Sequence, residues 1–330
     1  MTLPADPVLS VARSTALQNL TPIVVTGAAG FIGRALVQRL AGEGKPVVAV
    51  VKEPVALGPD IVVRAAGILG PESDWPALLA GAGAVVHLAS RAHVALADEQ
   101  SAIESEAATA AALARAARSA GIPRILLMSS IKVLGDATPS LPFRGHQPPA
   151  PEDAYGLAKW RMEEAMRSQA GDALVILRPP LVYGPGVKAN FRALLRLVRS
   201  GLPLPFAAID NRRSLIALDN LLDLIDVALT HPAAPGETFL LRDDENVSTP
   251  ELVRRIARAL GQTPRLFPFP PTLLRHAAAL LGRAASAERL IGSLRVDDLA
   301  TRERLGWRPR LSLDEGLAAT CRAFLAEGSP

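Results

Sequence analysis

Residues 22–33 read Pro-Ile-Val-Val-Thr-Gly-Ala-Ala-Gly-Phe-Ile-Gly. The β-branched run at the start is typical of a buried strand, and the glycines follow where the chain turns from a strand into a helix. Gly27 and Gly30 allow a tight turn and a close approach of backbone to a pyrophosphate, whose charge the helix N-terminus would meet. Gly33 would let the helix pack closely on the strand. Strand, glycine-rich turn and helix in this order indicate a dinucleotide-binding unit.

Short apolar runs and helical segments alternate after this unit. This alternation predicts right-handed βαβ units and an α/β fold with a Rossmann-like, doubly wound parallel sheet. A smaller, mostly helical C-terminal part would bind the substrate and return some strands to the sheet. We expect a flexible extension over residues 1–20, a dinucleotide-binding domain over 21–186 and a substrate-binding region over 187–330. Further strands are expected at 46–51, 61–63, 84–89, 125–128 and 174–177, and helices at 99–120 and from about 152.

Composition excludes several classes of protein. The chain has 330 residues, 49% of them hydrophobic, and a formal charge of +4. Because basic and acidic residues are interspersed, the charge indicates a solvated surface rather than nucleic-acid binding. Cys321 is the single cysteine, which excludes an intramolecular disulfide and a cysteine-based zinc site. We therefore expect a reducing, cytoplasmic location and no metal.

Two segments are candidates for a signal peptide or a membrane-spanning helix, and neither has the features that such a segment needs. The first twenty residues lack the apolar core of a signal peptide. Leu273–Leu281 is apolar but short, and Arg275 and His276 interrupt it. We expect no membrane-spanning segment, although an amphipathic contact with a membrane or a partner stays open.

The second strand bears on the choice of dinucleotide. An NAD-binding unit usually ends this strand with an acid that binds the ribose hydroxyls, whereas this chain has Val51 followed by Lys52. A lysine can pair with a 2′-phosphate, which an acid would repel. The sequence therefore favours NADP over NAD, with an ordinary exposed lysine as the alternative.

Chemistry-bearing residues follow the fifth strand. Ser129 and Ser130 stand at its carboxyl end, where ligands bind in open parallel sheets. Tyr155 and Lys159 are four apart in a predicted helix and so share one face. A cation beside a phenol stabilises the phenolate and suits it to proton transfer. His87, on a buried strand, is more typical of a core histidine than of a catalyst.

Four segments together resemble the extended short-chain dehydrogenase/reductase superfamily, within it the NAD-dependent epimerase/dehydratase group that acts on nucleotide sugars. The segments occur in the family's order, and the resemblance covers about residues 23–325. Within this group, the segments Ser129–Val133, Pro179–Phe191 and Asn211–Ser214 are similar to a bacterial branch from polysaccharide gene clusters, described as UDP-4-keto-6-deoxy-N-acetylhexosamine 4-reductases or UDP-glucose 4-epimerase-like proteins. The four segments are Thr26–Gly33, Ser129–Gly135, Tyr155–Lys159 and Arg178–Gly186.

The resemblance implies a role for individual residues. Tyr155 would be the acid/base, Lys159 would hold the nicotinamide ribose and polarise the tyrosine, and Ser130 would hydrogen-bond the sugar C4 oxygen. Asn190 and Arg213 would contact the UDP-sugar, with Arg213 at the diphosphate; the alternatives are helix capping and a surface ion pair. The implied cofactor-binding residues are Gly27, Gly30, Phe31, Ile32, Gly33, Lys52, Leu88, Ala89 and Lys159.

The chain departs from the family pattern in three places. Gly67-Ile68-Leu69 lacks the aspartate that often lies near the adenine. Ser105 stands where many members place an asparagine, and Leu134 replaces the tyrosine of a Val-Tyr-Gly segment, which indicates a packing change. Adenine recognition is the function that these departures put in question.

The reaction is left between alternatives. A 4,6-dehydratase needs a carboxylic acid/base pair after the serine, where this chain has Ile131 and Lys132. A 4-epimerase uses its cofactor catalytically, whereas a 4-reductase consumes NADPH, and Lys52 favours the reductase. A non-enzymatic sensor or scaffold would usually have lost Tyr155 or Lys159. The family also implies a homodimer formed through the helices at 99–120 and around Tyr155.

Overall fold

The computed structural model describes residues 21–90, 99–282 and 284–327. The expected extension at 1–20 lies outside them. The described residues form two compact units, one from the segments up to Met128 and Arg161–Val175, the other from Ser129–Trp160 and Ile176 onward. The functional boundary expected at 186/187 stays a prediction.

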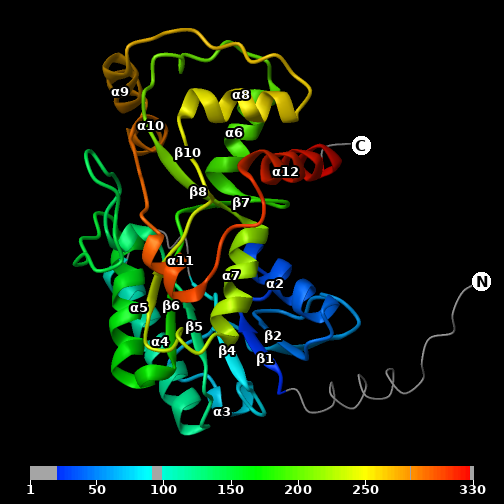
Figure 1. Cartoon of the computed structure of the whole chain (residues 1–330). Helices are drawn as coiled ribbons and strands as arrows, with labels where there is room; N and C mark the ends of the chain where they lie inside the picture. Colours follow the sequence, from blue (N-terminus) through cyan, green and yellow to red (C-terminus); the bar gives the residue numbers. More distant parts are fainter. Residues whose placement is uncertain (1–20, 91–98, 283, 328–330) are drawn as a thin grey trace, which may run out of the picture. The chain divides into compact units, whose positions relative to one another are not determined.

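The larger sheet has seven strands in the order β3-β2-β1-β4-β5-β6-β9 (Figure 1). The pairings of β1 with β2 and β4, of β2 with β3, of β4 with β5 and of β6 with β9 are parallel. The order includes the 3-2-1-4-5-6 arrangement of Rossmann folds, and the predicted fold class is confirmed. The strands are β1 (Ile23–Thr26), β2 (Val47–Val51), β3 (Ile61–Ala65), β4 (Ala84–His87), β5 (Ile125–Met128), β6 (Leu174–Arg178) and β9 (Thr238–Leu240).

Burial explains why these apolar runs become strands. Every residue of β2, β4, β5 and β6 is buried, as expected for parallel strands covered on both faces. β3, which lies at one edge of the sheet, is partly exposed to solvent along most of its length. The helices that the first unit contains or shares are α2 (Phe31–Gly42), α3 (Trp75–Leu78), α4 (Glu99–Ser119) and α5 (Ala154–Ala170).

The second unit has its own small sheet, in which β8 (Arg213–Ala217) pairs in parallel with β7 (Leu181–Tyr183) and antiparallel with β10 (Asn246–Val247). Two short 3-10 turns, η1 (Ile131–Val133) and η2 (Gly171–Ala173), precede α5 and β6. The remaining helices are α6 (Ala189–Arg199), α7 (Leu218–Thr230), α8 (Thr249–Ala259), α9 (Pro271–Leu280), α10 (Ala284–Ile291), α11 (Leu299–Leu305) and α12 (Leu313–Glu327).

A buried carboxylate joins the small sheet to α7. The Tyr183 hydroxyl donates a hydrogen bond to Asp243 at 2.7 Å, and Asp243 also accepts from the Ala217 backbone N–H and the Asn220 amide. Burial and the negative charge of Asp243 raise the pKa of Tyr183 above its ordinary value. Tyr183 is therefore a neutral structural hydrogen-bond donor, and it anchors the Arg178–Gly186 segment.

Candidate functional site

The glycine-rich turn of the first unit can be built only from glycine at two positions. Gly27 has a φ of +68°, and a Cβ there would lie 2.7 Å from the backbone nitrogen of Ala89. A Cβ on Gly33 would lie 2.3 Å from the carbonyl oxygen of Gly27. The turn, the start of α2 and the segment after β4 are therefore in backbone contact, and Leu88 and Ala89 lie against the turn, while their contact with a cofactor stays a prediction.

The N-terminus of α2 fits an anionic group. The helix begins at Phe31 after Gly30, which has no side chain to cap it, and its first turn contains no acid. The N–H groups of Phe31, Ile32 and Gly33 have no partner inside the helix, and the helix macrodipole is positive at this end. This geometry suits the pyrophosphate of a dinucleotide.

His87, which the sequence predicts to be a core residue, supports the glycine-rich turn through a hydrogen bond with Thr26. His87 is buried at the end of β4, and its Nδ1 lies 2.7 Å from the hydroxyl oxygen of Thr26. The same hydroxyl accepts a hydrogen bond from the Ala89 backbone N–H at 3.4 Å. The histidine thus links β1 to the segment that faces Gly27, and the interpretation as a satisfied core residue is confirmed.

Lys52 lies beside Gly67, the first residue of the segment that lacks the aspartate expected near the adenine. The Gly67 backbone N–H donates to the Lys52 carbonyl at 3.1 Å. The Lys52 side chain is 64% exposed, and its only ion-pair partner within the described residues is the neighbouring Glu53 at 3.5 Å. Ile68 is also exposed. The lysine is therefore accessible to an anion, although Glu53 offsets part of its charge.

Ser130 is the N-cap residue of the 3-10 turn η1 and lies two residues after the end of β5. It is buried, and its hydroxyl accepts a hydrogen bond from the Lys132 backbone N–H at 3.3 Å. The Ser129 and Ile131 backbone N–H groups donate to the Leu177 and Pro179 carbonyls. Leu134, which stands where the family places a tyrosine, is buried with Phe143 and other apolar residues, and the predicted change in packing relative to the family stays a prediction.

An ion-pair network joins this turn to the start of α5. The Lys132 ammonium contacts Asp153 and lies 3.0 Å from Asp136. Asp153 caps α5, because its other oxygen accepts the Gly156 backbone N–H at 2.8 Å. Burial alone would raise the pKa of Asp153, but the hydrogen bonds from Lys132 and Gly156 outweigh it and lower the pKa. A Cβ on Gly156 would lie 2.6 Å from the Lys132 carbonyl, so the helix and the turn are tightly packed.

Tyr155 and Lys159 occupy the first two turns of α5, as the four-residue spacing predicts. The Lys159 ammonium lies 5.9 Å from the centre of the Tyr155 ring, within the range of a cation–π interaction. Lys159 is 4% exposed, whereas Tyr155 is 36% exposed. The lysine is thus buried next to the tyrosine ring, whereas the tyrosine itself is partly exposed to solvent.

Two arginines of the second unit, Arg213 and Arg289, are close enough for their positive charges to repel each other. Arg213 begins β8 and donates to the Gly292 carbonyl at 2.9 Å. Burial, and next the positive charge of Arg289 on α10, lower the pKa of Arg213. Arg289 also contributes to the lowered pKa of Asp153, so its charge acts on both places. Arg213 makes no ion pair with a described carboxylate, so the surface-ion-pair alternative is wrong.

Asn190 lies in the first turn of α6 and is exposed. The residue that caps this helix is Lys188, and the Asn190 side chain makes no hydrogen bond within the described part of the chain. The capping alternative is therefore wrong, and substrate contact by Asn190 stays a prediction.

Sequence reasoning missed Lys132, Asp153 and Arg289 as parts of this site. Asp153 could have been found, because an aspartate directly before a helix is a common N-cap. The roles of Lys132 and Arg289 depend on contacts across 21 residues and on the approach of α10, for which no local pattern exists.

Other functional classes find no support in the described residues. They contain no cluster of three or more His, Cys, Asp or Glu side chains that could hold a metal. None of the helices between residues 21 and 327 that the structure describes has the length and apolar character needed to cross a membrane. Cys321 is buried, and burial raises the pKa of its thiol to about 11, which suits an inert core residue.

Comparison with known proteins gives consistent matches. The profile of the NAD dependent epimerase/dehydratase family matches residues 23–241. The chain is 39% identical to a UDP-glucose 4-epimerase of Vibrio cholerae, over 92% of this chain and 95% of that protein. It is 31% identical to a ceramide reductase of Caulobacter vibrioides, over 78% and 77%. A solved structure, MoeE5 in complex with UDP-glucose and NAD, superposes with a TM-score of 0.74 at 25% identity and covers 93% of this chain and all of that one.

Proposed function

Because the chain belongs to the NAD dependent epimerase/dehydratase family, we propose that it is a UDP-sugar 4-epimerase, an enzyme that inverts the configuration at C4 of the sugar. The observation that carries the proposal is the 39% identity with the Vibrio cholerae UDP-glucose 4-epimerase, which extends over nearly the full length of both proteins. The binding of UDP-glucose and NAD by MoeE5 supports the same class of substrate and cofactor.

The residues present can perform each proton transfer of this reaction. A dinucleotide bound at the glycine-rich turn would supply the acceptor for the C4 hydride and then its donor. Tyr155, as phenolate, takes the proton of the C4 hydroxyl while the hydride leaves, and the carbon becomes a ketone. After the ketone presents its other face, the hydride returns and Tyr155 gives the proton back, so protons and electrons balance over the cycle.

Ser130 and Lys159 assist Tyr155 in this proposal. The Ser130 hydroxyl donates a hydrogen bond to the C4 oxygen and orients it toward the phenol. Lys159, buried next to the Tyr155 ring, favours the phenolate by its charge. The Lys132–Asp153 contact supports both, because it joins the turn that carries Ser130 to the helix that carries Tyr155.

Arg213 and Arg289 are proposed to bind the diphosphate of the substrate. Two mutually repelling guanidinium groups, one of them largely buried, gain stability when an anion lies between them. A guanidinium also offers two parallel N–H groups to phosphate oxygens, which an ammonium does not. We add Asn190 as a substrate contact on the strength of the family resemblance alone.

A second candidate is a 4-ketoreductase that uses NADPH. Val51 and the exposed Lys52 favour it, since no acid at the end of β2 would repel a 2′-phosphate. The relative from Caulobacter vibrioides is named a reductase as well. Lys52 is compatible with either dinucleotide, whereas the more similar Vibrio relative is named an epimerase, and the epimerase is therefore the first candidate.

The two candidates differ in net cofactor use. We would incubate the purified protein and its Tyr155→Phe variant with UDP-glucose or UDP-N-acetylglucosamine and separate the C4 epimers by chromatography. The epimerase predicts conversion by the wild type without net change in nicotinamide absorbance. Stoichiometric loss of NADPH with a UDP-4-keto-6-deoxy-N-acetylhexosamine, and no epimer, would establish the reductase instead. Failure of both reactions would overturn the nucleotide-sugar assignment.

A further inference from the structure

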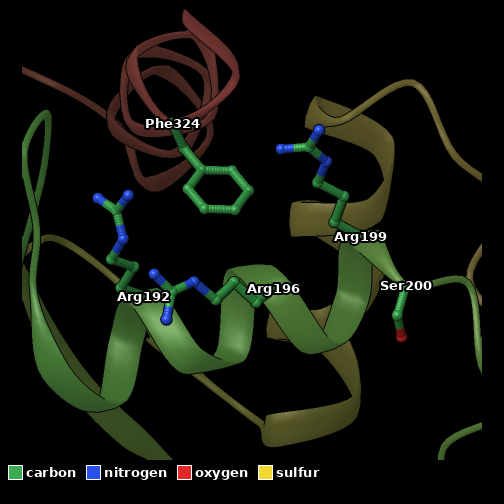
Figure 2. Close-up of a pocket in the computed structure, with 5 residues that line it drawn as sticks. All are labelled: Arg192, Arg196, Arg199, Ser200 and Phe324. Atoms are coloured by element: carbon green, nitrogen blue, oxygen red, sulfur yellow. The ribbon is translucent and has the colours of Figure 1, made fainter. Parts of the chain in front are cut away.

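Three arginines form a stripe along one face of α6, away from its buried face. Arg192, Arg196 and Arg199 are spaced by four and three residues, which places them on one side of a helix. Together with Ser200 and with Phe324 of α12, they line a hollow of about 470 Å³. Figure 2 shows the ring of Phe324 pointing from α12 toward α6, between the side chains of Arg192 and Arg199.

The hollow carries an excess of positive charge. Arg192 forms an ion pair with Glu327 at the end of α12. Arg196 and Arg199 have no carboxylate partner within the described residues, so two guanidinium groups lack a counter-charge. Like charges three and four residues apart on a helix repel each other and destabilise it. An anion in the hollow would remove this repulsion.

Phe324 orders two of these cations. Its ring is only 7% exposed, and the guanidinium carbons of Arg192 and Arg199 lie 5.7 and 5.6 Å from the ring centre. At such distances a guanidinium is attracted to the face of the ring. Because binding an anion normally requires ordering long arginine side chains, which opposes association, this arrangement lowers that cost in advance.

Helix stability alone does not account for the stripe. Cations in the last turn offset the negative end of the helix macrodipole, which explains Arg196 and Arg199. Arg192, however, lies in the first turn of α6, where the macrodipole disfavours a cation. The contacts that hold Arg192 there are its ion pair with Glu327 and the Phe324 ring, which it shares with Arg199.

We propose that this hollow is a second anion-binding site, which takes a soluble ligand with at least two linked phosphoryl groups. Arg192 and Arg199 are seven residues apart, about 10 Å between their Cα positions along the helix axis, so a ligand with two linked phosphoryl groups matches the length of the stripe better than one phosphate does. A diphosphate or triphosphate is such a ligand, and guanidinium groups bind phosphate oxygens in pairs. The site does not depend on the proposed epimerase activity.

The test is calorimetric titration of inorganic pyrophosphate into three proteins: the wild type, Arg196→Gln/Arg199→Gln, and Arg254→Gln/Arg258→Gln. The last pair of arginines is exposed on α8 and four residues apart, so this variant is a control with the same change in charge. Pyrophosphate that binds at other sites should bind equally to all three proteins, so it does not affect the comparison between them. Thermal unfolding verifies that each variant is folded, as expected for exposed helix positions.

We expect the wild type and the α8 variant to bind one more equivalent of pyrophosphate than the α6 variant, or to bind it at least tenfold more tightly, since two charge-assisted contacts are lost. Identical isotherms for the α6 variant and the wild type would overturn the proposal. An equal loss in the α8 variant would overturn it as well, because the effect would then reflect net charge and not the hollow.

Discussion

The glycine-rich turn and the turn that carries Ser130 both follow a buried parallel strand, yet they are held in different ways. At residues 27–33 the backbone itself makes the contacts, and a single added methyl group at Gly33 would meet the Gly27 carbonyl. At residues 129–136 backbone hydrogen bonds to Leu177 and Pro179 are joined by side-chain ion pairs, in which Lys132 bridges Asp136 of the same turn and Asp153 at the start of α5.

Because of this difference, the two regions should respond differently to mutation. A backbone contact tolerates no larger residue, so mutation of the glycine turn should act through steric clash and reduce both stability and cofactor affinity. A side-chain network holds reacting groups in place, and its mutation should lower the rate while the fold persists.

Replacing Tyr155 by Phe should reduce turnover of the nucleotide sugar by about 10²–10⁴-fold, because the proton acceptor is removed. The ring and its contact with Lys159 remain, so binding of the dinucleotide should not change. Turnover is measured by chromatography of the sugar epimers and cofactor affinity by calorimetry. Turnover close to that of the wild type would remove Tyr155 from the mechanism.

Replacing Gly33 by Ala should destabilise the protein by about 1–3 kcal/mol and weaken dinucleotide binding, because the new Cβ would lie 2.3 Å from the Gly27 carbonyl. The matched control is Gly42→Ala at the other end of α2, where a Cβ meets nothing within 4 Å. The control should be neutral or slightly stabilising, since alanine favours helix. Denaturant unfolding measures both, and equal effects would contradict a close-packing role for Gly33.

Replacing Lys132 by Met should lower kcat about tenfold and leave dinucleotide affinity unchanged, because the turn that carries Ser130 loses its contact with α5. Arg161→Met on the exposed face of α5 is the control, since its pair with Glu164 lies within one helix. Steady-state kinetics and calorimetry separate the two effects. A loss of dinucleotide affinity equal to the loss of rate would show that the network supports the fold in general.

The same network predicts a pH dependence. Because the pKa of Asp153 is lowered in the folded protein, its stabilising contribution is complete above its ordinary value of about 3.8 and is lost as the pH falls through the lowered value. The wild type should therefore be more stable than Asp153→Asn at pH 7, by about 1 kcal/mol or less, and this difference should disappear in acid. Thermal unfolding across this pH range measures it, and a difference that grows in acid would have the wrong sign.

Replacing Lys52 by Ala should have the smallest effect, a weakening of NADP by a few-fold with NAD unchanged. The side chain is mostly exposed and Glu53 already offsets its charge, which limits the gain from a 2′-phosphate. Calorimetry measures the affinity of the wild type and of the variant for each dinucleotide. An equal effect on the two would remove the argument for NADP.

The contrast between the two regions also explains what could be predicted from the sequence. The order of strands and helices and the glycine turn were predicted correctly, because each depends on residues that are adjacent in the chain. His87 was correctly assigned to the core from the apolar strand around it. Arg289 and Lys132 were not identified, because Arg289 acts on residues far away in sequence and the contact of Lys132 with α5 spans 21 residues, which no local spacing reports. Asp153 was missed although the helix start before Tyr155 contains an N-cap signal.

The most direct test of the central proposal, inversion at C4 by removal and return of the same hydride, is a proton NMR experiment with UDP-glucose that carries deuterium at C4. The account predicts that the wild type forms the C4 epimer with the deuterium still at C4, since the hydride removed from the sugar is the one returned. The absence of an epimer, or an epimer with hydrogen at C4, would contradict it.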